Sequence, residues 1–485
     1  MGKDLLIFSE RGLLEDAIRM VEVIVLPVKN ASLTQAFDHI RKNRESFLRD
    51  FRTLLRQPSV SAQGKGINDC ARIVKKYMDD AGITTQILPE KDGNPVVFGE
   101  VKSKTSSKTL LLYGHYDVQP VEPIEEWKSG PFEAKLQGKK IVARGAADSK
   151  NNVISCIKAT GSFLKTTGDV PLNLKFLFEG EEEIGSPHLP AFVEANKERL
   201  KADSVVCYDG DLDETGRAKI NLGVKGLLYV ELRCKKARED LHSSYAPLVE
   251  NPAWRLVWAL NSMKSPDGKI LIRGWYDDVE PFTPAQSKLV SKIPFHGANL
   301  LKEWGLKKFL DAKTDREAFK RYLMEPTCTI CGFKTGYIGQ GSKTVLPGSA
   351  MLKIDFRLVY NQNPKKLLAI LKDHLHYHGF DDIQVKALGF LEPSRTPPSA
   401  PIARAAAKAA KTTFGSNPVI LPRNPASGPD YLFTKRLGMD SIWTGSALPS
   451  AYSHAHAPNE YTTTDDFVNG IKYIGAIMQE FGKLN

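Results

Sequence analysis

Hydrophobic and polar positions alternate along the first half of the chain in a way that predicts a layered fold. Short continuous apolar runs, typical of strands buried on both faces, alternate with segments whose apolar residues recur at helical spacing. The expected strands are 109–113, 172–178 and 204–208, and the expected helices are 35–55, 68–80, 150–164 and 187–200. This alternation predicts an α/β layer with a mostly parallel sheet.

The pattern changes at about residue 222. Residues 226–234 alternate between apolar and polar, as in a strand with one exposed face. Further strands are expected at 329–333 and 350–359, helices at 252–263 and 364–378, and a charged, helix-rich insertion at 302–323. These elements predict a smaller α+β unit inserted into the first domain. The α/β pattern resumes at about residue 401, with a helix to 414, a strand at 441–444 and a helix at 466–481.

We therefore predict four segments. They are an N-terminal extension at 1–32, the first part of the main domain at 33–222, the inserted domain at 223–386 and the second part of the main domain at 387–485. The extension carries one amphipathic stretch, 13–23, and no motif.

Composition and charge exclude several functional classes. No apolar run approaches the roughly 20 residues that span a bilayer, and the short run at 21–28 lacks the features of a signal peptide, so no membrane partner is expected. The formal net charge is +11, but basic and acidic residues are interspersed and no nucleic-acid motif is present. We expect no nucleic-acid partner. Six scattered cysteines form no disulfide framework, which favours the cytoplasm.

Acidic residues and histidines follow the ends of the expected strands. In open α/β sheets, ligand sites lie beyond the carboxyl ends of the strands, so these side chains should meet at one edge. Carboxylates gathered there would raise one another's pKa values unless a cation neutralised them. Histidine and carboxylate ligands suit zinc, with cobalt or manganese as alternatives. The residues are His115, Asp117, Asp148, Glu179, Glu181, Glu182, Glu183 and Asp209.

Five motifs resemble, in order and spacing, the carnosinase, aminoacylase and glutamate carboxypeptidase family of di-zinc hydrolases, and the match runs from about residue 35 to the C-terminus. They are Gly114-His-Tyr-Asp-Val-Gln-Pro120, Arg144-Gly-Ala-Ala-Asp-Ser-Lys150, Phe178-Glu-Gly-Glu-Glu-Glu-Ile-Gly-Ser186, Asp240-Leu-His-Ser243 and His456-Ala-Pro-Asn-Glu460. The resemblance implies that the main domain is a catalytic domain of the zinc-peptidase type. It also implies that the inserted domain is a lid that forms a homodimer.

The resemblance assigns the metal ligands. Asp148 would bridge two divalent metal ions, with zinc as the expected metal. His115 and Asp209 would complete one site, and Glu183 and His456 the other. The peptide bond between Asp148 and Ser149 is expected to be cis.

Three catalytic roles follow from the same resemblance. Asp117 would orient His115 through a hydrogen bond to its ring. Glu182 would act as the general base that takes the proton of the attacking water and passes it to the leaving amine. His242, from the inserted domain of the neighbouring subunit, would polarise the scissile carbonyl.

Finer features resemble the cytosolic dipeptidase and carnosinase branch. Thr344 and Arg357 match positions that hold the terminal carboxylate of the substrate, Arg357 through a bidentate fork. Ser427 and Gly428 match a carboxylate-binding loop more loosely. Tyr360 departs from the pattern, because this branch usually has proline there.

Two other groups of metal-capable residues are not expected to bind metal. Cys328 and Cys331 have the spacing of half a zinc knuckle but no second pair. His374, His376 and His378 close a helix, where polar and basic side chains favour the helix dipole.

We predict a metallopeptidase that cleaves the amide bond of dipeptides or small peptides with a free C-terminal carboxylate. The alternative is an N-acyl amino acid deacylase of the succinyl-diaminopimelate desuccinylase or acetylornithine deacetylase type, because both reactions use the same two-metal chemistry. A catalytically inactive binding protein on the same fold would lack a ligand or the base, and all of them are present in the sequence.

Overall fold

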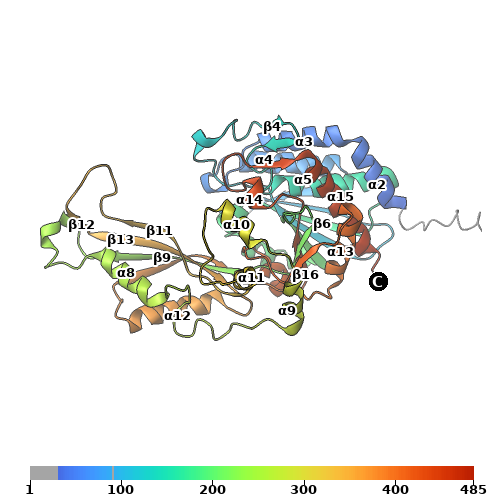
Figure 1. Cartoon of the computed structure of the whole chain (residues 1–485). Coiled ribbons are helices and arrows are strands. Elements are labelled where there is room, and N and C mark those ends of the chain that lie inside the picture. The colour runs from blue at the N-terminus through green and yellow to red at the C-terminus, as the bar shows by residue number, and fades with distance from the viewer. Residues whose placement is uncertain (1–30, 90–91, 485) are drawn as a thin grey trace, which may run out of the picture.

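The computed structural model describes residues 31–89 and 92–484, which form two bodies (Figure 1). The amphipathic stretch predicted at 13–23 lies outside the described residues. The larger body contains the main sheet and most of the helices, and the smaller one is an elongated sheet with two helices along one side. In the described part of the chain, no helix is long and apolar enough to cross a membrane.

The larger body is built on an eight-stranded sheet in the order β1-β2-β6-β3-β7-β16-β8-β15. The central strands β6, β3, β7 and β16 are parallel neighbours, which confirms the predicted α/β class. The strands are β1 (Thr84–Leu88), β2 (Val96–Val101), β3 (Thr109–His115), β6 (Asn173–Glu179), β7 (Ser204–Tyr208), β8 (Lys219–Asn221), β15 (Val419–Leu421) and β16 (Asp440–Thr444). A small separate sheet joins β4 (Lys135–Gln137), β5 (Lys140–Val142) and β17 (Tyr461–Thr463).

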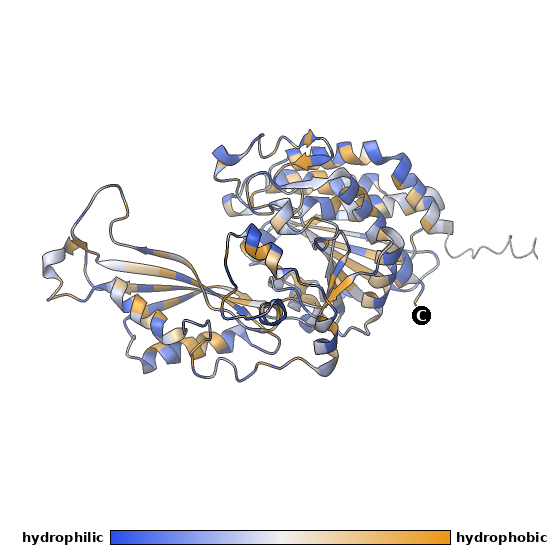
Figure 2. Cartoon of the chain, in the orientation of Figure 1, coloured by the Kyte–Doolittle hydropathy of each residue, from blue (hydrophilic) through white to orange (hydrophobic). Residues whose placement is uncertain are grey.

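The larger hydrophobic core joins this sheet to a layer of helices. Figure 2 shows apolar residues along the strands and polar residues on the outer faces of the helices. The helices are α2 (Ala31–Lys42), α3 (Arg44–Arg56), α4 (Ile67–Asp80), α5 (Lys150–Thr167), α13 (Pro401–Phe414) and α15 (Thr464–Gly482). A second core on the sheet includes α6 (Leu189–Ala195) and the end of α7 (Lys197–Leu200).

Two predicted helices are each divided in the structure. The helix expected at 35–55 is interrupted at Asn43, whose side-chain amide donates a hydrogen bond to the carbonyl of His39. The helix expected at 187–200 begins only at Leu189 and is interrupted at Asn196, whose amide bonds back to Phe192. In both cases the side chain shares its acceptor carbonyl with the asparagine's own backbone N–H, a local side-chain contact that competes with regular helix.

The smaller body is an antiparallel sheet in the order β11-β13-β9-β14, covered on one face by α8 and α12 around its own core. The elements are β9 (Gly226–Lys235), α8 (Pro252–Met263), β11 (Thr329–Thr335), β13 (Ser349–Leu358), α12 (Pro364–Tyr377) and β14 (Ile383–Leu391). At its far end β10 (Leu241–His242) pairs with β12 (Val345–Leu346) (Figure 1). The four-segment division stays a prediction, and its limit at 386/387 falls inside β14.

The insertion in the smaller body is larger than the sequence pattern suggests. Three short helices, α9 (Pro284–Ser291), α10 (Gly297–Glu303) and α11 (Asp315–Met324), replace the helix-rich stretch expected at 302–323. Thr283 caps α9 and Thr314 caps α11 through their side-chain oxygens. The insertion shares a small core with β15 of the main sheet.

Candidate active site

The carboxyl ends of the parallel strands deliver the predicted ligands to one edge of the main sheet. β3 ends at His115, and Asp209 follows the end of β7. Glu183 lies four residues beyond β6, and Asp148 lies two residues before α5. Because these strands run in parallel, their ends meet at one edge, and the structure brings all four side chains together with His456.

These five residues form two overlapping groups that share Asp148. In the first group, Nε2 of His115 lies 3.3 Å from Oδ1 of Asp148 and 3.5 Å from Oδ1 of Asp209. In the second, Nε2 of His456 lies 2.9 Å from Oδ2 of Asp148 and 3.2 Å from Oε2 of Glu183. Each oxygen of Asp148 thus faces one group, as expected of a carboxylate that bridges two cations.

The donor atoms fit metal ions. The buried Nε2 of His115 and the buried Oε1 of Glu183 make no hydrogen bond among the described residues. Burial, together with the neighbouring Asp148 carboxylate, raises the pKa of Glu183 to about 7. Burial also raises the pKa of Glu182 well above its usual range, with a further contribution from Glu183 that His115 opposes. Carboxylates so close together and so short of water need a cation to stay ionised.

Asp117 contacts His115 and the loop after β6. Nδ1 of His115 makes a hydrogen bond of 3.1 Å with the backbone carbonyl of Asp117 and lies 3.3 Å from its fully buried carboxylate. This carboxylate accepts hydrogen bonds from the backbone N–H groups of Glu182 (3.2 Å) and Glu183 (3.1 Å). It therefore connects the end of β3 to the loop after β6. A partner of this kind fixes the ring orientation of a ligating histidine.

Sequence reasoning missed the role of Glu460. Its buried carboxylate accepts hydrogen bonds from the backbone N–H groups of Gly145 (3.0 Å), Ala147 (2.8 Å) and Asp148 (2.9 Å), and it pairs with Arg144 at 2.8 Å. Both charged residues belong to motifs that the sequence displays, but only the tertiary contact reveals that Glu460 holds the turn carrying Asp148. The peptide bond from Asp148 to Ser149 is cis, as expected.

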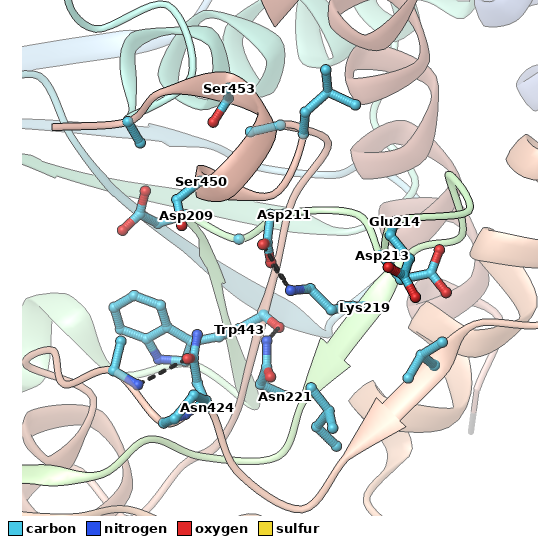
Figure 3. A pocket seen from close by; sticks show the side chains of 18 of the residues that line it. Asp209, Asp211, Asp213, Glu214, Lys219, Asn221, Asn424, Trp443, Ser450 and Ser453 are labelled. Carbon is cyan, nitrogen blue, oxygen red and sulfur yellow. Dashed lines mark hydrogen bonds and ion pairs between the residues drawn. The ribbon is translucent and has the colours of Figure 1, made fainter. Parts of the chain in front are cut away.

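The metal-capable groups open into a cavity of about 590 Å³. Figure 3 shows Asp209, Asp211 and Trp443 around it. The predicted base and two of the predicted carboxylate-binding residues line the same cavity; they are Glu182, Arg357 and Ser427. Arg357 also donates a hydrogen bond of 3.2 Å from Nε to Asp355.

The loop at Ser427 and Gly428 has a structural role as well. The Ser427 hydroxyl donates a hydrogen bond of 2.9 Å to the carbonyl of Gly226. Gly428 does not line the cavity, and a Cβ there would lie 2.4 Å from the ring of Trp443. Glycine at 428 is therefore explained by the close packing of Trp443.

The structure does not bring His242 and Thr344 to the cavity of their own chain. His242 lies in β10, and Thr344 precedes its partner strand β12 at the far end of the smaller body (Figure 1). The two residues are neighbours, because the backbone N–H of Ser243 donates a hydrogen bond of 3.1 Å to the carbonyl of Thr344.

The two groups that we set aside are the histidines at the end of α12 and the pair Cys328 and Cys331. The rings of His374 and His378 lie 4.4 Å apart between their centroids, and Nε2 of His374 lies 3.0 Å from the hydroxyl of Ser262. Within residues 31–89 and 92–484, neither these histidines nor Cys328 and Cys331 belong to a metal-capable group.

The fold and the site define a metal-dependent hydrolase, and the comparisons with known proteins specify which. The chain matches Peptidase family M20/M25/M40 over residues 111–480 and belongs to that family. It is 39% identical in sequence to the structure of an M20 family metallo-carboxypeptidase, Sso-CP2, from Sulfolobus solfataricus, with a TM-score of 0.86 over 90% of this chain and 99% of that one. The predicted family resemblance and enzyme class are confirmed.

Two curated relatives are dipeptidases. The Cys-Gly metallodipeptidase DUG1 of Candida albicans is 27% identical over 93% of this chain and 98% of its own length. The Beta-Ala-His dipeptidase of Homo sapiens is 28% identical over 81% of this chain and 78% of its own length. Both matches agree with the predicted carnosinase-like branch.

Proposed function

We propose that this protein is a dipeptidase that hydrolyses the peptide bond of dipeptides or other small peptides with a free C-terminal carboxylate. The observation that carries the proposal is the shared cavity, in which two ligand groups joined by Asp148 face the carboxylate of Glu182 and the guanidinium of Arg357. The two ligand groups and Glu182 supply the chemistry of hydrolysis. The guanidinium of Arg357 supplies a positive charge that matches the carboxylate end of a peptide.

His115, Asp148 and Asp209 would hold one divalent ion, and Asp148, Glu183 and His456 the other. Two zinc ions are our first expectation, with manganese or cobalt as alternatives. When bound, such a pair supplies Lewis acidity that lowers the pKa of water and polarises a carbonyl oxygen.

Glu182 then acts as the general base. Its carboxylate lines the cavity, and burial raises its pKa well above the usual range, so it holds a proton more readily than an exposed glutamate does. It takes a proton as water attacks the peptide carbon and returns that proton to the leaving amine. Asp117 keeps His115 in place during these steps.

The names of the relatives support a peptide substrate over an N-acyl amino acid. Two of them are called dipeptidases and the third a carboxypeptidase, and each of these names describes cleavage of a bond between two amino acids rather than removal of an acyl group. The deacylase alternative has less support.

We further propose that the enzyme is a homodimer. His242 and Thr344 lie away from the cavity of their own chain, where they could serve the cavity of a partner. The smaller body also exposes apolar surface, including the stacked rings of Trp254 and Trp258 on α8 and the residue Ile330 on the edge strand β11. A homodimer would cover such a surface.

A cytoplasmic location is also proposed. All six cysteines are unpaired, and five of them are buried. Free thiols of this kind suit a reducing compartment.

The test is a substrate panel on metal-reconstituted protein. We expect hydrolysis of alanyl-alanine, and about two metal ions per chain. The amide of alanyl-alanine lacks the free carboxylate and should react far more slowly, and N-acetylalanine and N-succinylalanine should be poor substrates. Faster hydrolysis of either N-acyl amino acid would favour the deacylase, and trialanine cleaved at its C-terminal bond would indicate carboxypeptidase activity.

A further inference from the structure

The insertion supplies one wall of the catalytic cavity. Of its apolar residues there, Tyr322 is exposed and Phe295 is half-buried, and they lie over a small core that contains Ile293, Phe319 and Leu323. Val419 and Leu421 of β15 belong to the same core and join it to the main sheet. The same cavity contains Asp148 and Glu182, so a substrate at the metal-capable groups lies within reach of the apolar wall.

This wall is held in place by buried contacts. The rings of Phe295 and Phe319 stack with their centroids 4.8 Å apart, and Leu323 is fully buried. The guanidinium of Arg316 on α11 donates hydrogen bonds to the carbonyls of Val290 (2.7 Å) and Ile293 (3.2 Å), which joins α11 to α9. The wall is therefore a fixed surface.

Acidic side chains that also line this part of the cavity are already paired. The pairs are Asp211 with Lys219 (2.6 Å; Figure 3), Asp213 with Arg217 (2.7 Å) and Glu214 with His296 (3.3 Å). A charged substrate side chain would have to break one of these pairs or be buried without a partner, which costs free energy. An apolar side chain would leave all three pairs intact.

Tyr322 connects the apolar wall to Arg357. Tyr322 lines the cavity and is 56% exposed. The surrounding walls still desolvate its hydroxyl group and raise its pKa, as does the carboxylate of Asp211, while the guanidinium of Arg357 acts in the opposite direction. The hydroxyl group therefore lies within the electric field of both charged residues.

The backbone makes the same connection. Three residues after α11 ends, the N–H of Thr327 donates a hydrogen bond of 3.0 Å to the carbonyl of Arg357. The N–H of Arg357 in turn donates one of 3.3 Å to the hydroxyl of Thr327. The insertion and the carboxylate-binding position are thus fixed to each other.

We propose that the insertion wall receives the side chain of the substrate's C-terminal residue and that the enzyme prefers a bulky apolar residue there. This inference rests on the proposed function, in which Arg357 holds the C-terminal carboxylate. The side chain and the carboxylate of that residue are both bonded to its α-carbon, so a carboxylate at Arg357 places the side chain within reach of Tyr322 and the wall.

The first experiment compares dipeptides that differ only in the C-terminal residue. Alanyl-phenylalanine and alanyl-leucine should exceed alanyl-glycine in kcat/KM by about 10- to 100-fold, the range that apolar pockets reach. Alanyl-aspartate and alanyl-lysine should show no such gain. Phenylalanyl-alanine tests the other side of the bond and should not exceed alanyl-alanine by a similar factor.

Variants then test the wall itself. Tyr322→Ala should lower the ratio of kcat/KM for alanyl-phenylalanine over alanyl-glycine by about ten-fold. Tyr322→Arg should raise the ratio of kcat/KM for alanyl-aspartate over alanyl-phenylalanine. The matched control is Trp304→Ala, because Trp304 is an equally exposed aromatic residue of the insertion that does not line the cavity. This control should leave the ratio unchanged.

The outcomes separate this inference from the function on which it rests. Hydrolysis of all the alanyl dipeptides with kcat/KM values within two-fold of one another would leave the dipeptidase function standing and overturn the inference. A preference that follows only the N-terminal residue would overturn it too, as would equal effects of the Tyr322 and Trp304 variants. Failure to hydrolyse any dipeptide would overturn both.

Discussion

The buried carboxylate of Glu460 accepts a hydrogen bond of 2.9 Å from the backbone N–H of Asp148, the residue shared by both ligand groups. Glu460 comes from the end of the chain, 312 residues away, and also pairs with the buried Arg144. The position of the Asp148 carboxylate thus depends on a second, buried carboxylate.

We predict that Glu460→Gln destabilises the protein and weakens metal binding. The amide keeps the shape of the side chain but leaves Arg144 without its charged partner, and breaking a buried ion pair costs about 3–5 kcal/mol. Urea unfolding should show the loss of stability, and metal analysis should show fewer ions per chain. The control is Glu194→Gln, which removes an exposed pair with Lys197 worth at most about 1 kcal/mol. Equal stability of the two variants would contradict the prediction.

A second prediction concerns the base. Glu182→Gln should lower kcat by about 10²–10⁴-fold, the usual contribution of a general base, while folding and metal content stay intact. Glu181→Gln is the matched control, because the Glu181 carboxylate is bound to the backbone N–H of Asn94 (2.8 Å) and faces His188. Near wild-type kcat in Glu182→Gln would move the base role elsewhere, and a loss of activity in Glu181→Gln would point to that neighbour.

How far the sequence predicts the site depends on how local each relationship is. His115 and Asp209 are predictable because each follows a recognisable apolar strand, and parallel strands present their ends at one edge. The role of Glu460 is not predictable in this way, since it depends on a contact between distant segments. The apolar wall is hidden for the same reason, because Phe319 meets Leu421 only after the insertion docks on β15.

The fold shows the same division. Short apolar runs such as β3 and β7 are located closely. In contrast, β1 is not predicted because no residue of it is fully buried, and β2 is not predicted because its burial depends on pairing with the distant strand β6. The helix interruptions at Asn43 and Asn196 are not predicted either, because the helical spacing of apolar residues continues across them.

A third prediction follows from the buried Lys225. Burial, then the Arg423 and Arg357 guanidinium groups, lower the pKa of Lys225 to about 7. At pH values between about 7 and the ordinary lysine pKa of about 10.4, Lys225 carries a proton in the unfolded chain but not in the folded chain. Lys225 therefore makes the free energy of unfolding rise with pH in this window, by up to about 1.4 kcal/mol per pH unit.

The variant Lys225→Met should remove this dependence. The free energy of unfolding of the variant minus that of wild type should be largest below pH 7 and should fall steadily toward pH 10. Urea unfolding at several pH values measures this difference. Lys288→Met, at an exposed position on α9, controls for the loss of a positive charge. A difference between Lys225→Met and wild type that stays constant across the window would contradict the prediction.

The fourth prediction is that each active site needs two chains. His242 lies beside Thr344 at the far end of the smaller body, and neither lines the cavity of its own chain. In a two-fold dimer, self-complementary contact lets each subunit lend a residue to the other. His242 would then donate a hydrogen bond to the substrate oxygen as negative charge develops there, and losing such a donor costs on the order of 10²–10³ in kcat.

Mixing two inactive variants, His242→Ala and Glu182→Gln, after dissociation and reassociation of the subunits tests this arrangement. If His242 acts on the partner's substrate, one site of each mixed dimer contains both Glu182 and His242, and the other contains neither. Random mixing in equal amounts makes half of the dimers mixed, so about a quarter of wild-type activity should return. If His242 serves its own chain, every site in the mixture lacks one of the two groups. Persistent inactivity, with subunit exchange verified by labelled chains, would therefore overturn the prediction.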